Sequence, residues 1–243
     1  MVRFMRFVFS FFLVLCSASV LLAVSWEDVL DGKIDAARDA QIKSVQEIIQ
    51  IKSYNHGSPT TPSEGVKQVL DYALELGRQM GFRAHKHPEY RFGYLETGPE
   101  SAPEMVMVLV HLDTVPEGNL ELWTLAGPFE GKIVDGKLIG RGAFDDKGPA
   151  VSSMYALKAI NDAGLSLNRR IRIFFGTSED GSGSDGKSWS CVAEYAKLCK
   201  EGKEEWPVLG FSPDSGSFAV TYIEKTGVNV AGKLPVEASK AIR

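Results

Sequence analysis

The chain has 243 residues, of which 44% are hydrophobic and 24% are charged. This composition is typical of a folded globular protein and excludes a disordered chain. The formal net charge is −4, and the absence of a basic run argues against nucleic acid or an anionic membrane surface as the partner. We therefore expect a small ligand.

Residues 1–25 have the pattern of an export signal. Arg3 and Arg6 precede an apolar run, and residues 23–25 (AVS) form a small-residue cleavage site. The run over 7–24 is also about the ~18 residues that span a bilayer, so an uncleaved membrane anchor is the alternative. We expect cleavage, a secreted or periplasmic protein, and no stable membrane insertion of the mature chain.

Two helices follow the signal. Ile42, Val45 and Ile49 lie at amphipathic spacing and mark the first. The second covers 61–81, and we expect Thr61 to cap it, because Pro and Glu follow at positions typical of a first helical turn.

The next predicted strand, 105–110, is continuously apolar, as in strands covered on both faces. It leads directly into His111 and Asp113. An Asp-Gly pair at 135–136 predicts a hairpin turn. The stretch GRGAFDDKGP (140–149) then places two adjacent acids, Asp145 and Asp146, before a predicted helix over 149–163.

The last third of the chain repeats the alternation. Two further strands are predicted, over 170–180 and 206–214, with a helix over 187–200 between them. Cys191 and Cys199 both lie on that helix, where eight residues of rise separate them by roughly 12 Å, so we expect core packing and no disulfide.

Strands that alternate with helices predict an α/β fold with a doubly wound, mostly parallel sheet and helices on both faces. Such sheets bind ligands beyond the carboxyl ends of their strands. The predicted strands end in acidic or imidazole side chains: His111 and Asp113, then Glu179 and Asp180, then Asp214. We expect these side chains to meet at one edge, together with Asp145.

Carboxylates that converge in this way repel one another and raise their own pKa values unless a cation neutralises them. A metal site is therefore the simplest interpretation of the acidic strand ends. Oxygen ligands with one imidazole suit zinc, manganese or a similar divalent ion, and composition does not choose among them.

Five segments carry a family resemblance: HLDTVPEGN, WTLAGPF, GRGAFDDKGP, GTSEDGSGS and SPD, in this order. The set resembles the co-catalytic zinc metallopeptidases that include carnosinases, aminoacylases and carboxypeptidase G, and is most similar to the branch of Xaa-His and bacterial dipeptidases. The similarity covers roughly 46–227. It implies hydrolysis of dipeptides or short peptides by a zinc-peptidase catalytic domain.

The resemblance also implies site roles. It makes His111 and Asp214 ligands of one zinc ion, Asp180 a ligand of a second, and Asp145 the carboxylate that bridges the two. Catalytic roles follow for Glu179 as general base and for Asp113, which orients the ligand imidazole.

This sequence departs from the family in two ways. Asp180 stands where the family has a second Glu, and no His follows His111, although the family takes a further His ligand from downstream of a lid domain. We expect a signal over 1–25, a first segment of the catalytic domain over 26–223, and the start of a truncated, essentially absent lid domain over 224–243. We therefore expect weak binding of a second zinc ion, and little or no activity of this polypeptide alone.

Two other functions fit parts of the pattern. A non-catalytic remnant would bind one metal or a peptide without hydrolysing it. GSGSDG (181–186) matches a dinucleotide fingerprint, but Glu179 and Asp180 would repel the pyrophosphate, which requires free backbone amides. We expect Asp146 to be structural, paired with Lys147 or with a backbone N–H.

Overall fold

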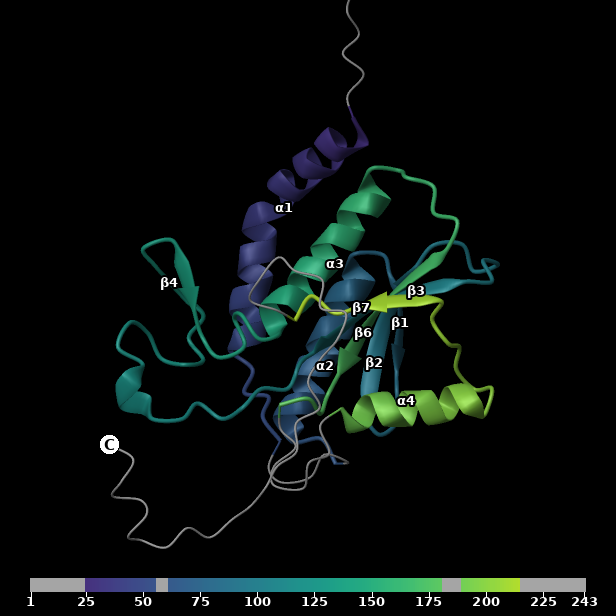
Figure 1. Ribbon diagram of the computed structural model, residues 1–243. Coiled ribbons are helices and arrows are strands. Elements are labelled where there is room, and N and C mark those ends of the chain that lie inside the picture. The colour runs from purple at the N-terminus through teal and green to yellow at the C-terminus, as the bar shows by residue number, and fades with distance from the viewer. Residues whose placement is uncertain (1–24, 56–60, 181–188, 215–243) are drawn as a thin grey trace, which may run out of the picture.

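The computed structural model describes residues 25–55, 61–180 and 189–214. These residues form a five-stranded sheet in the order β1-β2-β6-β3-β7 (Figure 1). Its strands are β1 (Arg83–Lys86), β2 (Phe92–Thr97), β3 (Met105–His111), β6 (Arg170–Gly176) and β7 (Leu209–Phe211). β3 pairs in parallel with β6 and β7, whereas β2 pairs antiparallel with β1 and β6. In this described sheet only β2 therefore runs against the others.

Helices cover both faces of the sheet. They are α1 (Trp26–Ile49), α2 (Glu64–Gln79), α3 (Lys147–Asp162) and α4 (Ser190–Lys200), with a short 3₁₀ turn η1 (Leu120–Leu122). α2 and α3 pack on the sheet with α1 against α3, and α4 lies on the opposite side (Figure 1). The predicted fold class, a mostly parallel α/β sheet between helices, is confirmed.

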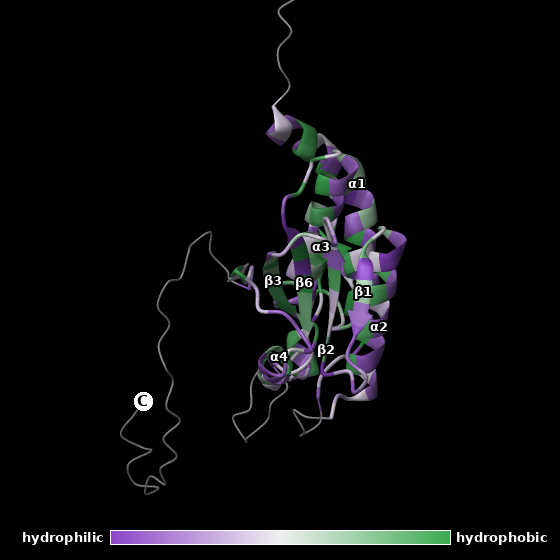
Figure 2. Cartoon of the chain, turned by 90° about the vertical axis from the view of Figure 1, so that its right-hand side faces the viewer, coloured by the Kyte–Doolittle hydropathy of each residue, from purple (hydrophilic) through white to green (hydrophobic). Residues whose placement is uncertain are grey.

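Two hydrophobic cores follow from the two-residue period of the central strands. On β3, Val108 and Val110 face the core under α2 and α3, whereas Met105 and Met107 face α4. β6 divides its residues between the same two cores. Successive side chains on a strand point to opposite faces, so a continuously apolar strand serves two layers. Figure 2 shows this hydrophobic character in β3 and β6 between the helices.

Several local predictions can be compared with the structure. The hairpin is confirmed: Asp135 and Gly136 have φ of 49° and 73° between β4 (Lys132–Val134) and β5 (Lys137–Ile139). Cys191 and Cys199 are free and buried in α4, as expected.

Other local predictions were wrong. α2 begins at Glu64 with Ser63 as its N-cap, whose Oγ accepts the N–H of Val66 at 3.3 Å, so Thr61 does not cap it. β7 is a three-residue exposed strand, although its sequence run resembles that of buried β3. In the described part of the chain β7 pairs only with β3. The pair of β1 and β2 was not predicted.

Three predictions lie outside the described residues: the export signal, the GSGSDG segment at 181–186, and the lid segment over 224–243. The described helices include none with the length and hydropathy needed to cross a membrane.

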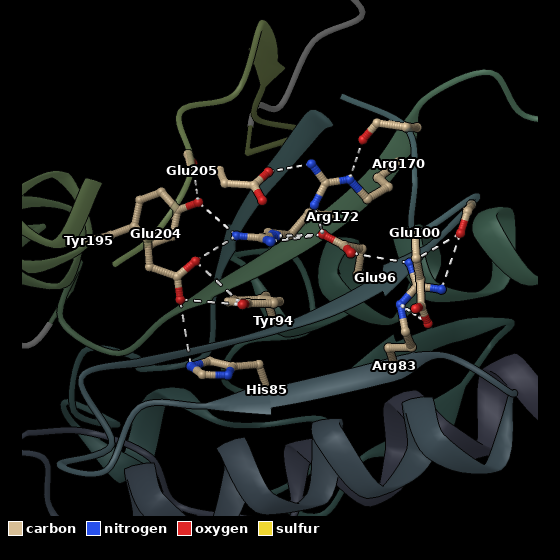
Figure 3. A network of polar contacts seen from close by, with 12 residues as sticks. Arg83, His85, Tyr94, Glu96, Glu100, Arg170, Arg172, Tyr195, Glu204 and Glu205 are labelled. Atoms are coloured by element: carbon tan, nitrogen blue, oxygen red, sulfur yellow. Dashed lines mark hydrogen bonds and ion pairs between the residues drawn. The ribbon is translucent and has the colours of Figure 1, made fainter. Parts of the chain in front are cut away.

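A buried polar network lies on the α4 side of the sheet (Figure 3). The guanidinium of Arg172 donates from Nε to Glu96 at 3.0 Å and from Nη1 to Glu204 at 3.0 Å. Nη1 also donates to the Tyr195 hydroxyl at 2.8 Å, and the guanidinium lies 3.7 Å from the centre of the Tyr94 ring. The network joins β2 and β6 to α4 and to the segment that leads into β7.

Candidate metal centre

The six predicted site residues gather at the carboxyl edge of the parallel strands. His111 is the last residue of β3, and Asp113 follows it. Glu179 and Asp180 follow β6, Asp214 follows β7, and Asp145 lies just before α3. Parallel strands end at one edge of a sheet, so tertiary structure brings together residues that lie far apart in the sequence.

His111 is the centre of this arrangement, and its side chain is fully buried. Its Nε2 atom lies 3.0 Å from Asp145 Oδ1, 3.7 Å from Asp214 Oδ2 and 3.8 Å from Glu179 Oε2. The Asp145 side chain is 55% exposed, so the site opens to solvent on the side away from the imidazole. One buried nitrogen thus faces three carboxylates from three segments.

Two sets of three donors have the spacing of a metal site. The first is His111, Asp145 and Asp214, and the second is His111, Glu179 and Asp180, with the donor atoms of each set within 4.8 Å of one another. Both sets use His111. Among the residues that the structure describes, no second set of three is independent of that imidazole.

The two acids after β6 are held by backbone contacts. Asp180 Oδ2 accepts the N–H of Val115 at 3.2 Å. Asp113 Oδ1 accepts the N–H of Glu179 at 3.0 Å. The loops after β3 and β6 are therefore tied to each other directly beside His111.

Asp113 contacts the imidazole through both its main chain and its carboxylate. His111 Nδ1 lies 3.0 Å from the Asp113 carbonyl oxygen and 3.6 Å from its carboxylate Oδ1. Nδ1–H can donate to that carbonyl, which leaves Nε2 as the nitrogen available to a metal once its proton is lost. The Asp113 carboxylate also accepts the N–H of Glu179, and the orienting role of Asp113 stays a prediction.

The electrostatics of the site follow from acids held together in a partly buried place. Burial lowers the pKa of His111, but the carboxylates of Asp113, Asp146 and Asp180 outweigh burial and raise that pKa to about 10. Burial and neighbouring carboxylates raise the pKa of Glu179 to about 7. A cation at this place would relieve the repulsion among the acids.

Asp146 has a structural contact, as predicted. Its Oδ2 accepts the backbone N–H of His111 at 3.0 Å, and burial raises its pKa to about 7. Of the two partners expected for it, the backbone N–H is the one observed. Asp146 therefore attaches the turn that carries Asp145 to the end of β3.

Lys147 is a contributor that sequence reasoning missed. Its side chain is fully buried, and Nζ donates to the carbonyl oxygens of Ile48 at 3.1 Å and Ile51 at 2.6 Å, at the end of α1. Burial lowers the pKa of the Lys147 amino group to about 7, and the two carbonyls accept its hydrogen bonds. This contact anchors the turn that carries Asp145 to α1. In the sequence, only the position of Lys147 within the DDKGP stretch could have indicated this role.

The acidic edge is distinct from an apolar groove that the described residues form elsewhere. That groove has a volume of about 1100 Å³ and lies between α1, α3 and the β7 side of the sheet. Its lining is mainly aliphatic and includes none of the six site residues. The donor chemistry for a metal therefore lies only at the strand ends, within the described residues.

One buried imidazole among carboxylates, at the carboxyl edge of such a sheet, is typical of a metal-dependent hydrolase. Residues 107–232 match the model of peptidase family M20/M25/M40. The chain belongs to this family, a family of metallopeptidases.

A bacterial relative agrees with this assignment. The chain is 34% identical over 223 residues to the protein named "Putative dipeptidase YtjP" of Bacillus subtilis (strain 168). The alignment covers 90% of this chain and 43% of the relative. The chain thus spans less than half the length of that relative.

Solved structures share the fold. Human carnosine dipeptidase 1 matches with a TM-score of 0.62 and 21% identity over 78% of this chain and 41% of its own. The dipeptidase Dug1p of Saccharomyces cerevisiae matches with a TM-score of 0.52 and 19% identity over 73% of this chain and 38% of its own.

Proposed function

We propose that this chain carries the metal-binding half of a dipeptidase-like active site that hydrolyses short peptides with zinc. One observation carries the proposal: His111 Nε2 lies within 3.8 Å of carboxylates from three separate segments. Family membership supports the reaction class, and the names of the relative and of both solved structures support a dipeptide substrate. His111, Asp145 and Asp214 are the proposed zinc ligands.

The donor set fits a divalent ion of this kind. An imidazole nitrogen and carboxylate oxygens are common zinc ligands, and the first set supplies three of them. When bound, such an ion polarises a peptide carbonyl and makes a nearby water more acidic.

Glu179 is the proposed general base. Its Oε2 lies 3.8 Å from His111 Nε2, so it is placed to take a proton from a water at the metal site and to return that proton to the leaving amine. The hydrogen bond from its N–H to Asp113 fixes the backbone from which the carboxylate extends. Asp113 therefore contacts both the proposed base and His111, and fixes their relative positions.

Binding of one metal without turnover is the second candidate function. The shared use of His111 by both donor sets favours it, because one imidazole nitrogen serves one ion. Within the described chain, the second set combines Asp180 with Glu179 and the shared His111, so it competes with the first set for the imidazole. A two-metal site would require a donor beyond these residues.

Metal content and hydrolysis, measured on one preparation, distinguish the two functions. A catalytic site requires at least one tightly bound zinc per chain and a measurable, low rate of amino-acid release from a dipeptide panel that includes β-Ala-His. Glu179→Gln should abolish release and retain zinc, whereas the exposed control Glu75→Gln should change neither. Zinc without release supports the second candidate function, and no bound zinc would refute both.

A further inference from the structure

Trp189 is the aromatic neighbour of the proposed zinc ligand. It is the N-cap of α4 and has a left-handed backbone, with φ of 58° and ψ of 28°. The indole and the His111 imidazole meet edge to face, with ring centres 5.9 Å apart and planes at 85°. This is a favourable geometry for two aromatic rings, and it opposes rotation of the imidazole about its side-chain bond.

The approach of Trp189 depends on a glycine beneath it. Gly176 ends β6 and pairs in register with His111. A Cβ atom at Gly176 would lie 3.0 Å from Cζ3 of Trp189, 3.2 Å from Sγ of Cys191 and 3.5 Å from Cβ of His111. The indole therefore packs against the backbone of β6 at Gly176, immediately beside His111.

Hydrogen bonds fix Trp189 to the segment after β6, which carries the proposed base. Its N–H donates to the carbonyl of Ser178 at 2.7 Å. The Ser178 hydroxyl lies 2.9 Å from that of Ser190 and accepts the N–H of Cys191 at 3.0 Å. The next residue after Ser178 is Glu179, the proposed general base.

These contacts close into a ring. His111 contacts Asp113, Asp113 accepts the N–H of Glu179, Ser178 accepts the N–H of Trp189, and the indole of Trp189 returns to His111. A change at any member therefore alters the placement of the imidazole relative to the base.

The geometry points to Trp189 as a positioning residue that fixes the plane of the His111 imidazole at the metal site. This inference rests on the proposed function, because it requires that His111 binds a metal. It has a second consequence: a metal held by His111 lies close enough to the indole to change its fluorescence. Groups that orient metal ligands commonly change metal affinity by about 10- to 100-fold when removed.

The test is a Co²⁺ titration of the full chain, followed by visible absorption and by tryptophan fluorescence. We compare Trp189→Phe, Trp189→Leu and the matched control Trp206→Leu, whose indole is exposed and belongs to the segment before β7. Trp189→Phe keeps an aromatic edge. It should retain the absorption bands and bind Co²⁺ within about threefold of the unmodified chain, and lose most of the metal-dependent fluorescence change. Trp189→Leu should shift the bands and weaken binding at least about tenfold.

The control should keep both the bands and the fluorescence change. Unchanged bands and affinity in Trp189→Leu would refute the positioning role, and a full fluorescence change in Trp189→Phe would refute the proximity of the indole to the ion. If Trp189→Leu does not fold, as judged by circular dichroism, Trp189→Met replaces it with the same expected band shift and loss of affinity, and unchanged bands and affinity in Trp189→Met would refute the positioning role. Absence of Co²⁺ binding by the unmodified chain would instead refute the metal site itself.

Discussion

Removal of the Arg172 guanidinium by Arg172→Met is expected to destabilise the fold by about 3 kcal/mol. The side chain is 4% exposed and lies between Glu96 and Glu204, which are each 9% exposed (Figure 3). Deleting one partner of a buried ion pair costs about 3 to 5 kcal/mol, because the other charge stays buried without compensation.

The structure places the expected value near the lower end of that range. Glu96 keeps two arginines after the substitution: Arg83 at 3.2 Å and Arg170 at 3.8 Å. Among the described residues, Glu204 keeps the Tyr94 hydroxyl at 3.3 Å and His85 at 3.7 Å. Most of the loss should therefore come from the carboxylate of Glu204.

Urea denaturation at neutral pH measures this loss. The matched control is Arg78→Met, whose partner Glu75 lies at 3.3 Å with both side chains about half exposed, and it should cost less than about 1 kcal/mol. The double variant Arg172→Met/Glu204→Gln should regain about 1 to 2 kcal/mol relative to the single variant, because the orphaned charge is gone. A loss at Arg172 no larger than that at Arg78, or no recovery in the double variant, would contradict the reasoning.

Three further results are expected. Asp145→Asn should raise the zinc dissociation constant at least about tenfold in a dye-competition titration, since it removes the carboxylate 3.0 Å from His111; unchanged affinity would remove Asp145 from the ligand set. The pKa of His111 is raised to about 10, so zinc must displace a proton from the imidazole when it binds. The zinc dissociation constant should therefore fall about tenfold per pH unit between about pH 6 and 8. A dissociation constant that does not change over this range would contradict the reasoning. Gly65→Ala would place a Cβ 1.7 Å from the Lys52 carbonyl and should cost about 3 kcal/mol in thermal unfolding, whereas Gly32→Ala, with open space around it, should be neutral or slightly stabilising.

The sequence predicted elements best where local chemistry is strong. The Asp-Gly pair at 135–136 specified a tight hairpin, because its two residues accept positive φ. Helical spacing separated Cys191 from Cys199, and both are free. Cap positions were less reliable: Thr61 and Ser63 are both good N-caps, and packing of α2 selected Ser63.

Exposure could not be predicted from hydrophobicity alone. The run before Asp214 resembles the buried run of β3, yet Leu209 and Phe211 are 63% and 58% exposed. A strand's burial depends on which elements cover it, and the strand's own residues do not encode those neighbours. The antiparallel β2 was missed for a related reason, since its pairing with β6 is a long-range choice.

By itself the sequence determined the alternation of helices and strands, and therefore the sheet edge at which His111, Glu179 and Asp214 would meet. Residue type and position after a strand are local properties, and parallel strands share a direction. Only the tertiary structure decided which contacts hold the site in place. Asp113 contacts the His111 imidazole, Lys147 donates to a carbonyl at the end of α1, and the Trp189 ring packs against the imidazole. Such contacts join segments that lie far apart in the chain, so they depend on packing distances that no local pattern contains.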